Sequence, residues 1–238
     1  MRILVLQHLA IENPGIFADY WKEAGHSLHT VELDEGATIP PLDGFDLMVV
    51  MGGPMDTWQE DQHPWLVGEK AAIRTWVRDL GRPYLGFCLG HQLLGAALGG
   101  TVGLMRSPEV GLMDVALTEE GRADPIFAGI PPAIGTLQWH GAEISAPPKD
   151  AVVLASNDAC PVQVIRCGRR AYGFQCHVEI SNTTVGDWAC VPEYKLSLER
   201  TLGAAAAANL ATTVAEKLPT FHAIARRLND NFFALISK

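Results

Sequence analysis

The chain has 238 residues, 48% of them hydrophobic, which is enough to bury a substantial core, and we expect residues 1–238 to form a single α/β domain. The 27 acidic residues outnumber the 18 Lys and Arg, and the net charge of -9 argues against a nucleic-acid-binding surface. No apolar stretch approaches membrane-spanning length, and the apolar run at the start of the chain is too short, with polar residues soon after it, for a signal peptide. We therefore expect a cytoplasmic protein with no membrane contact.

The first part of the chain alternates predicted strands with predicted helices. Short runs rich in leucine and β-branched residues are typical of strands buried on both faces of a parallel sheet. Predicted strands cover residues 2–7, 29–33, 46–51 and 83–85, and predicted helices cover residues 15–24 and 64–80. This alternation predicts a doubly wound, mainly parallel sheet flanked by helices, with ligands outside the carboxyl ends of the strands.

A cysteine lies between the last of these strands and a helix-like segment, in the sequence Gly86-Phe87-Cys88-Leu89-Gly90. Glycines two residues on either side of a nucleophile let the backbone turn sharply, which is the elbow arrangement with cysteine in place of serine. The helix that follows directs free amide groups and its positive dipole end at the sulfur, which favours the thiolate. A buried cysteine in a core turn is the structural alternative.

The second half of the chain is less regular. Short strands are predicted at residues 101–105, 110–117 and 152–156, separated by turns rich in proline and glycine, and they predict a small β-rich excursion from the main sheet. Helices are predicted at residues 202–218 and 220–236.

A histidine and a glutamate two residues apart strengthen the case for a reactive cysteine. Residues 172–179 alternate apolar and polar side chains as a strand does, and they include His177 and Glu179. Side chains two apart on an extended chain share a face, so the carboxylate can orient the imidazole while its other nitrogen faces the sulfur. The sequence therefore predicts a nucleophile, a base and an orienting group in Cys88, His177 and Glu179.

The spacing of the cysteines and histidines does not indicate a metal site or a disulfide framework. The five cysteines are an odd number with no C-x-x-C pair, which disfavours a disulfide framework and a zinc knuckle. The eight histidines are scattered, with no H-E-x-x-H motif. We expect reduced thiols, no metal and no cofactor.

Three separated motifs resemble those of the class I (triad-type) glutamine amidotransferases, in the order found in that family. They are Gly52-Gly53-Pro54-Met55, the segment from Gly86 to Gln92, and the segment from Gly173 to Glu179. A stand-alone chain of this kind is similar to the branch of the amidotransferase domain of GMP synthase. Family members commonly have Phe and Pro where this chain has Cys176 and Val178, a departure that bears on specificity.

The resemblance implies a flavodoxin-like sheet and a set of roles. Cys88 attacks the side-chain amide carbon of glutamine or another γ-glutamyl compound, His177 acts as base and then acid, Glu179 fixes its tautomer, and water hydrolyses a glutamyl thioester. The backbone amides of Gly53 and Leu89 form the oxyanion hole. The implied substrate-binding residues are Gln92, Gly141 and Ala142.

Three functions are consistent with these residues. The first is an amidotransferase that releases ammonia for a separate synthetase subunit, since the chain has no Walker loop with which to activate an acceptor itself. The second is a stand-alone γ-glutamyl hydrolase or peptidase. The third is a non-catalytic binding module of the same fold, which retention of all three triad positions disfavours.

Overall fold

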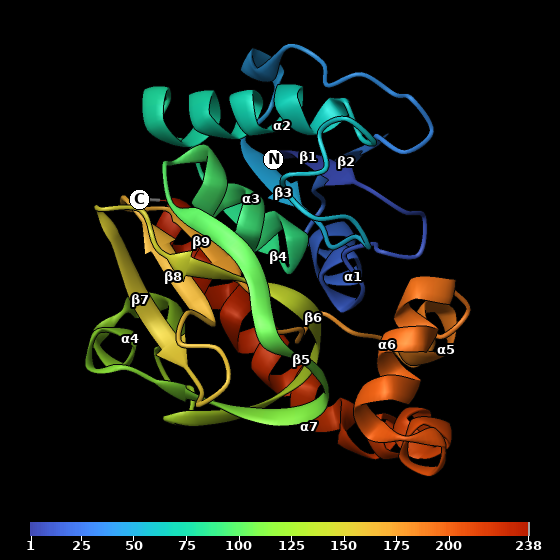
Figure 1. Cartoon of the computed structure of the whole chain (residues 1–238). Helices are drawn as coiled ribbons and strands as arrows, with labels where there is room; N and C mark the ends of the chain where they lie inside the picture. Colours follow the sequence, from blue (N-terminus) through green and yellow to red (C-terminus); the bar gives the residue numbers. More distant parts are fainter. Residues whose placement is uncertain (238) are drawn as a thin grey trace.

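The computed structural model describes residues 1–237, and within this range nine strands form one sheet in the order β2-β1-β3-β4-β9-β8-β7-β5-β6 (Figure 1). The first five strands of that order are parallel to one another. Their bounds, in chain order, are β1 Arg2–Gln7, β2 Ser27–Glu32, β3 Leu47–Val50, β4 Tyr84–Phe87 and β9 Ala171–Phe174. The helices that follow β1, β3 and β4 in the chain are α1 Ile16–Glu23, α2 Trp65–Arg74 and α3 Leu89–Ala97.

Two hydrophobic cores lie on the two faces of these parallel strands, because successive side chains of a strand point to opposite faces. Ile3 and Val5 of β1 belong to the core that α1 and the C-terminal helix cover. Leu4 and Leu6 belong to the core that α2 and α3 cover. Helices on both faces confirm the α/β class and explain why these strands read as nearly continuous apolar runs.

The other half of the sheet corrects the sequence prediction. The segments predicted as two short strands are one long strand, β5 Thr101–Leu117, irregular between Leu104 and Glu109, and it pairs with β6 Ala133–Ala146. Strands β6 and β8 Val164–Cys167 were missed, whereas β7 Ala151–Ser156 was predicted. All four pairings in this half are antiparallel, so the sheet is mixed rather than mainly parallel and the β-rich part is an extension of it.

The C-terminal region also differs from expectation. Between the sheet and the end of the chain lie α5 Thr184–Trp188 and α6 Pro192–Leu202, and the two predicted terminal helices are one helix, α7 Ala204–Ile236, with Pro219 inside it. A short helix, α4 Glu119–Ala123, follows β5. A third apolar cluster joins α5, α6 and the start of α7 to β5 and β6.

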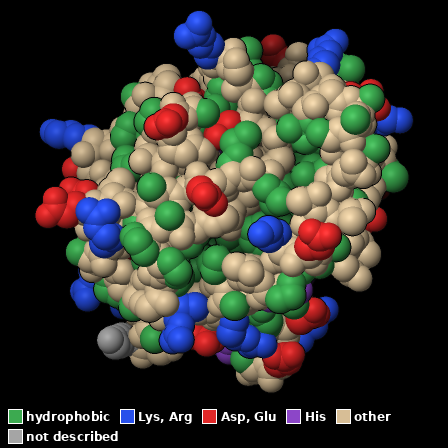
Figure 2. Space-filling model, turned by 90° about the horizontal axis from the view of Figure 1, so that it is seen from below, with side chains coloured by type: hydrophobic (Ala, Val, Ile, Leu, Met, Phe, Trp, Pro, Cys, Tyr) green, Lys and Arg blue, Asp and Glu red, His purple; other side chains and the backbone are tan. Residues whose placement is uncertain are grey.

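The carboxyl ends of β3, β4 and β9 meet at one edge of the sheet, because these strands are adjacent and parallel. Among the described residues no helix combines the length and the apolar character needed to cross a bilayer. On the face seen in Figure 2, acidic and basic side chains are interspersed among hydrophobic ones.

Candidate active site

Cys88 occupies the strand-to-helix turn in a strained backbone conformation. It follows β4 directly and is the N-cap of α3, with φ 47° and ψ -103°. It is the one non-glycine residue of positive φ among residues 1–237. Its backbone N–H donates to the carbonyl oxygen of Phe174 at 2.8 Å, which ties the turn to the end of β9. A non-glycine residue in this region costs free energy that the surrounding structure must supply, and such strain is typical of functional sites.

The two glycines of the turn are required by close packing. A Cβ on Gly86 would lie 2.6 Å from the carbonyl carbon of Gly90, and a Cβ on Gly90 would collide with the carbonyl oxygen of Val50. The hydroxyl of Tyr84 donates to the carbonyl oxygen of Gly90 at 2.7 Å. The helix therefore begins close against β3 and β4, which fixes the position of the Cys88 side chain.

The segment after β9 brings His177 and Glu179 to the same edge. The strand predicted over residues 172–179 ends at Phe174, but His177 remains extended and bonds to Leu137 of β6 through both of its backbone groups. The Nδ1 atom of His177 lies 2.6 Å from Oε1 of Glu179, and the other carboxylate oxygen accepts from the N–H of Val178 at 2.9 Å. The predicted pairing of imidazole and carboxylate is therefore present.

The sulfur of Cys88 and the ring of His177 are neighbours. Burial lowers the pKa of His177, but the Glu179 carboxylate and the nearby Cys88 side chain outweigh it, so this pKa is raised well above 6.5. The three side chains named from the sequence thus converge.

A cavity of about 190 Å³ opens at Cys88. Gly53, from the loop after β3, and Gln92, one turn into α3, line it together with Gly141 and Ala142 of β6. The backbone N–H of Leu89 is in the first turn of α3, where helix geometry leaves amides without an intrahelical partner. Of the residues named from the sequence, the cavity lining thus includes Gly53, Cys88, Gln92, Gly141 and Ala142, and it does not include Leu89, His177 or Glu179.

The contacts of Gln92 define how it faces the cavity. Its Nε2 donates to the carbonyl oxygen of Ala142 and to Oε1 of Gln175, both at 3.0 Å. The Ala142 carbonyl also accepts from Nδ1 of His140 at 3.0 Å. Two side chains already use this carbonyl, so in this arrangement it positions Gln92 and His140.

Sequence reasoning missed one wall of the cavity, which α6 supplies through Glu193, Tyr194 and Ser197. The hydroxyl of Tyr194 donates to Oε1 of the buried Glu12 at 2.6 Å. Burial raises the pKa of Glu12, and burial together with the Glu12 carboxylate raises the pKa of Tyr194 well above 10. Proline at the first position of α6 was the available sequence signal for this helix.

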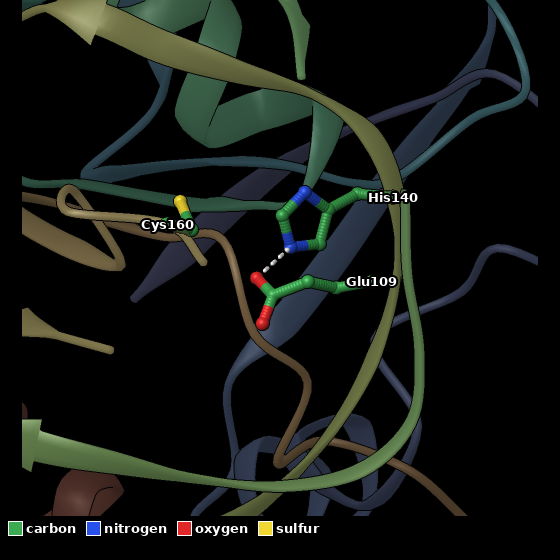
Figure 3. A group of neighbouring side chains, drawn as sticks. All are labelled: Glu109, His140 and Cys160. Atoms are coloured by element: carbon green, nitrogen blue, oxygen red, sulfur yellow. Dashed lines mark ion pairs between the residues drawn. The ribbon is translucent and has the colours of Figure 1, made fainter. Parts of the chain in front are cut away.

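A second buried cluster supports the cavity wall behind His140 (Figure 3). Ligand-type atoms of Glu109, His140 and Cys160 lie within 4.8 Å of one another. Oε2 of Glu109 lies 3.1 Å from Nε2 of His140, and this carboxylate also accepts from the side-chain amides of Asn157 and Gln163. Burial raises the pKa of the Cys160 thiol to about 12. We describe the cluster as a hydrogen-bonded support for His140.

Known proteins are similar to this chain in sequence and in fold. A model of the family "Glutamine amidotransferase class-I" matches residues 15–188. The chain is 32% identical over 195 residues to YfeJ, a glutamine amidotransferase-like protein of Salmonella typhimurium, covering 76% of this chain and 77% of that protein. It is 32% identical over 160 residues to one subunit of the glutamine-hydrolysing GMP synthase of Sulfolobus acidocaldarius, covering 67% of this chain and 80% of that protein.

Among solved structures, a glutamine amidotransferase from Thermotoga maritima is similar with a TM-score of 0.86 and 26% identity, covering 98% of this chain and 97% of that chain. With 98% of this chain covered, that similarity extends to α6 and α7, which lie beyond the family match. The chain belongs to the class-I glutamine amidotransferase family.

Proposed function

We propose that this protein is a cysteine-dependent amidohydrolase that hydrolyses the γ-amide of glutamine. The Cys88 thiolate attacks the amide carbon, and His177 gives its proton to the departing nitrogen. Ammonia is released, and the glutamyl group remains on Cys88 as a thioester. Water, deprotonated by His177, then hydrolyses the thioester to glutamate and restores the thiol. The observation that carries this proposal is the convergence of Cys88, His177 and Glu179 beside one cavity.

The remaining site residues bind substrate or stabilise charge. The amides of Gly53 and Leu89 donate to the tetrahedral oxygen, and losing one such donor typically costs roughly a hundred- to a thousand-fold in rate. Because both hydrogens of the Gln92 amide are donated within the protein, its Oε1 serves as an acceptor for the substrate. Gly141 and Ala142 line the part of the cavity that receives the amino-acid end of the substrate.

We propose that the ammonia passes to a separate synthetase subunit. The relative from Sulfolobus acidocaldarius is named as one subunit of a glutamine-hydrolysing GMP synthase, so an amidotransferase-like chain that works beside another chain has a precedent in this family. The absence of a Walker loop from the sequence supports acceptor activation on another chain.

A stand-alone γ-glutamyl hydrolase is the second candidate, and the C-terminal helices favour it. Helix α6 contributes Glu193, Tyr194 and Ser197 to the cavity, yet it lies beyond the residues that match the family model. A cavity wall added to the family's common region is where preference for a particular leaving amine would arise.

We also propose that residues 1–238 are one domain and that its parallel half is flavodoxin-like. The packing of α7 on the first strands, in one core, supports a single domain. The order β2-β1-β3-β4-β9 in the parallel half supports the flavodoxin-like description.

A substrate panel on the purified chain separates these functions. We expect ammonia release from glutamine, and we expect Cys88→Ala to abolish it while circular dichroism is unchanged. Faster turnover of γ-glutamyl peptides than of glutamine would favour the stand-alone hydrolase. Turnover of none of these substrates, with or without cell lysate, would contradict both enzymatic proposals and leave the binding module.

A further inference from the structure

A buried ion pair lies directly behind the loop that carries Gly53. His8, immediately after β1, and Glu69, on α2, are both completely buried. The Nε2 atom of His8 lies 2.9 and 3.1 Å from the two carboxylate oxygens of Glu69, and its Nδ1 lies 2.9 Å from the carbonyl oxygen of Gly52. Neither side chain lines the cavity at Cys88.

Both nitrogens of His8 therefore face oxygen acceptors. The Gly52 carbonyl cannot donate a hydrogen bond, so Nδ1 of His8 carries a hydrogen. The ionised Glu69 carboxylate cannot donate either, so Nε2 also carries one. Burial lowers the pKa of His8, but its contacts with the Glu69 carboxylate and the Gly52 carbonyl outweigh burial and raise it. The ring is thus a doubly donating imidazolium paired with Glu69.

The direction of the Gly52 carbonyl decides the direction of the Gly53 amide, since both belong to one peptide unit. This unit is trans, because no cis peptide bond occurs among the described residues. In a trans peptide the carbonyl and the following N–H point in opposite directions. A carbonyl held by His8 therefore turns the Gly53 N–H away from His8.

Nothing in the two glycines themselves would hold this orientation. Glycine on each side gives the peptide unit unusual freedom to rotate. A larger residue, which would restrict this rotation, has little room at either position. A Cβ on Gly52 would collide with the Glu12 carboxylate, and a Cβ on Gly53 would lie 3.0 Å from Cβ of His8. An external hydrogen bond is needed to fix the unit.

We propose that His8 and Glu69 are positioning residues that hold the Gly52-Gly53 peptide with its N–H directed at the tetrahedral oxygen formed at Cys88. The proposal rests on the proposed function insofar as that oxygen arises during acylation of Cys88. A cation on the carbonyl also polarises the peptide and makes the N–H a better donor. The pair acts without touching substrate.

The test compares two reactions of Cys88, of which one needs an oxyanion hole. Acylation by p-nitrophenyl acetate passes through a tetrahedral oxyanion, whereas alkylation by iodoacetamide is a direct displacement that does not. Neither reagent depends on recognition of glutamine. Peptide mapping by mass spectrometry reports modification of Cys88 separately from that of the exposed Cys190.

The test variant replaces both partners, His8→Leu with Glu69→Met. Replacing a buried ion pair with apolar side chains of similar volume is often neutral for stability, whereas removing one partner strands a buried charge. We expect the acylation rate of Cys88 to fall roughly ten- to a hundred-fold, less than complete loss of a donor. We expect the alkylation rate to change less than about three-fold, because the thiolate and its His177 partner are untouched.

A matched variant restores only the hydrogen bond. In His8→Asn with Glu69→Met, the side-chain amide nitrogen takes the place of Nδ1 and can donate to the Gly52 carbonyl. We expect it to recover most of the acylation rate. If wild type hydrolyses glutamine, the double variant His8→Leu with Glu69→Met, here called the apolar pair, should lower kcat with little change in KM. The hydrogen bond from the Gly53 N–H to the tetrahedral oxygen forms in the transition state and not with bound glutamine.

Two outcomes would overturn the proposal. One is an unchanged ratio of acylation to alkylation in the apolar pair. The other is a loss of both reactions in a variant whose circular dichroism is native, which would indicate a general effect on the site. An inactive wild type on glutamine, with the ratio still reduced in the apolar pair, would refute the proposed substrate and leave the positioning role standing.

Discussion

At the scale of single residues, the site combines one strained position with a set of buried polar pairs. Cys88 has φ 47° at a tightly packed turn, so its side chain is fixed by the backbone. His177 is fixed by Glu179, and Gly53 by the carbonyl contact of its neighbour with His8. Cys88 is therefore held by its own backbone, whereas His177 and the peptide before Gly53 are held by polar partners outside the cavity lining.

The strain at Cys88 predicts an unusual response to glycine. Positive φ costs a non-glycine residue about 1–3 kcal/mol, whereas glycine costs about 0.5–1 kcal/mol in unfolded-state entropy. We expect Cys88→Gly to be more stable than Cys88→Ala by about 1 kcal/mol in urea unfolding. The control is Ala206→Gly, the same chemical change on an exposed turn of α7, which should lose about 1 kcal/mol. A Cys88→Gly variant less stable than Cys88→Ala would contradict the strain.

The Glu179 carboxylate predicts how His177 titrates. The pKa of His177 is raised in the folded state, so its contribution to stability is complete below 6.5 and is lost as pH rises through the folded pKa. In Glu179→Gln burial dominates, and we expect the NMR titration of the His177 ring to shift to lower pH, with slower hydrolysis than in wild type.

The control for this titration is Glu193→Gln, an exposed acid at the cavity that does not set the pKa of His177. It should leave the His177 titration unchanged. Equal titration curves for His177 in wild type and Glu179→Gln would show that the carboxylate does not hold the ring protonated.

The residues that sequence reasoning found and missed differ in their separation along the chain. His177 and Glu179 are two apart, so their pairing follows from local geometry. His8 and Glu69 are 61 positions apart, and Tyr194 and Glu12 are 182 apart, so only the folded chain brings them together. A polar residue with no local partner gives no sequence signal of such a contact.

At the scale of elements, the parallel strands were predicted, whereas two of the antiparallel strands, β6 and β8, were missed. Strands β1, β3 and β4 are almost wholly buried and bounded by turn residues, which gives a strong apolar signal. The buried positions of β6 include the polar Gln138 and His140, whose hydrogen bonds satisfy them inside the protein. The apolar pattern there is broken for a reason that is visible only in three dimensions.

Helix α7 shows the opposite error, because a proline that predicts a break does not end the helix. Pro219 has no N–H to donate and is exposed, with helix on both sides. We expect Pro219→Ala to raise the free energy of unfolding by about 1–3 kcal/mol, since it restores a hydrogen bond and removes a steric conflict. Thr220→Ala, on the exposed neighbour, should change it by less than about 0.5 kcal/mol. No gain in Pro219→Ala would mean that the helix has already adapted to proline.

At the scale of the whole molecule, the end of the chain completes the core of its beginning. Phe232 of α7 is 1% exposed and belongs to the same cluster as Ile3 and Phe17. The family model ends at residue 188, so this contact decides whether the C-terminal helices are an appendage or part of one folding unit.

We expect Phe232→Ala to destabilise the entire protein by about 3–5 kcal/mol, with tryptophan fluorescence and circular dichroism reporting one coincident transition. Phe233→Ala, on the adjacent and less buried ring, should cost clearly less. Two separate transitions in wild type or variant would contradict a single domain.

The proposed function depends on acylation of Cys88 by the side chain of glutamine. Mass spectrometry of protein mixed with glutamine and quenched in acid measures this directly. We expect a transient mass increase of one γ-glutamyl group on the peptide that contains Cys88, and no such adduct in Cys88→Ala. Glutamine hydrolysis that continues in Cys88→Ala, or a γ-glutamyl adduct confined to another cysteine, would contradict it.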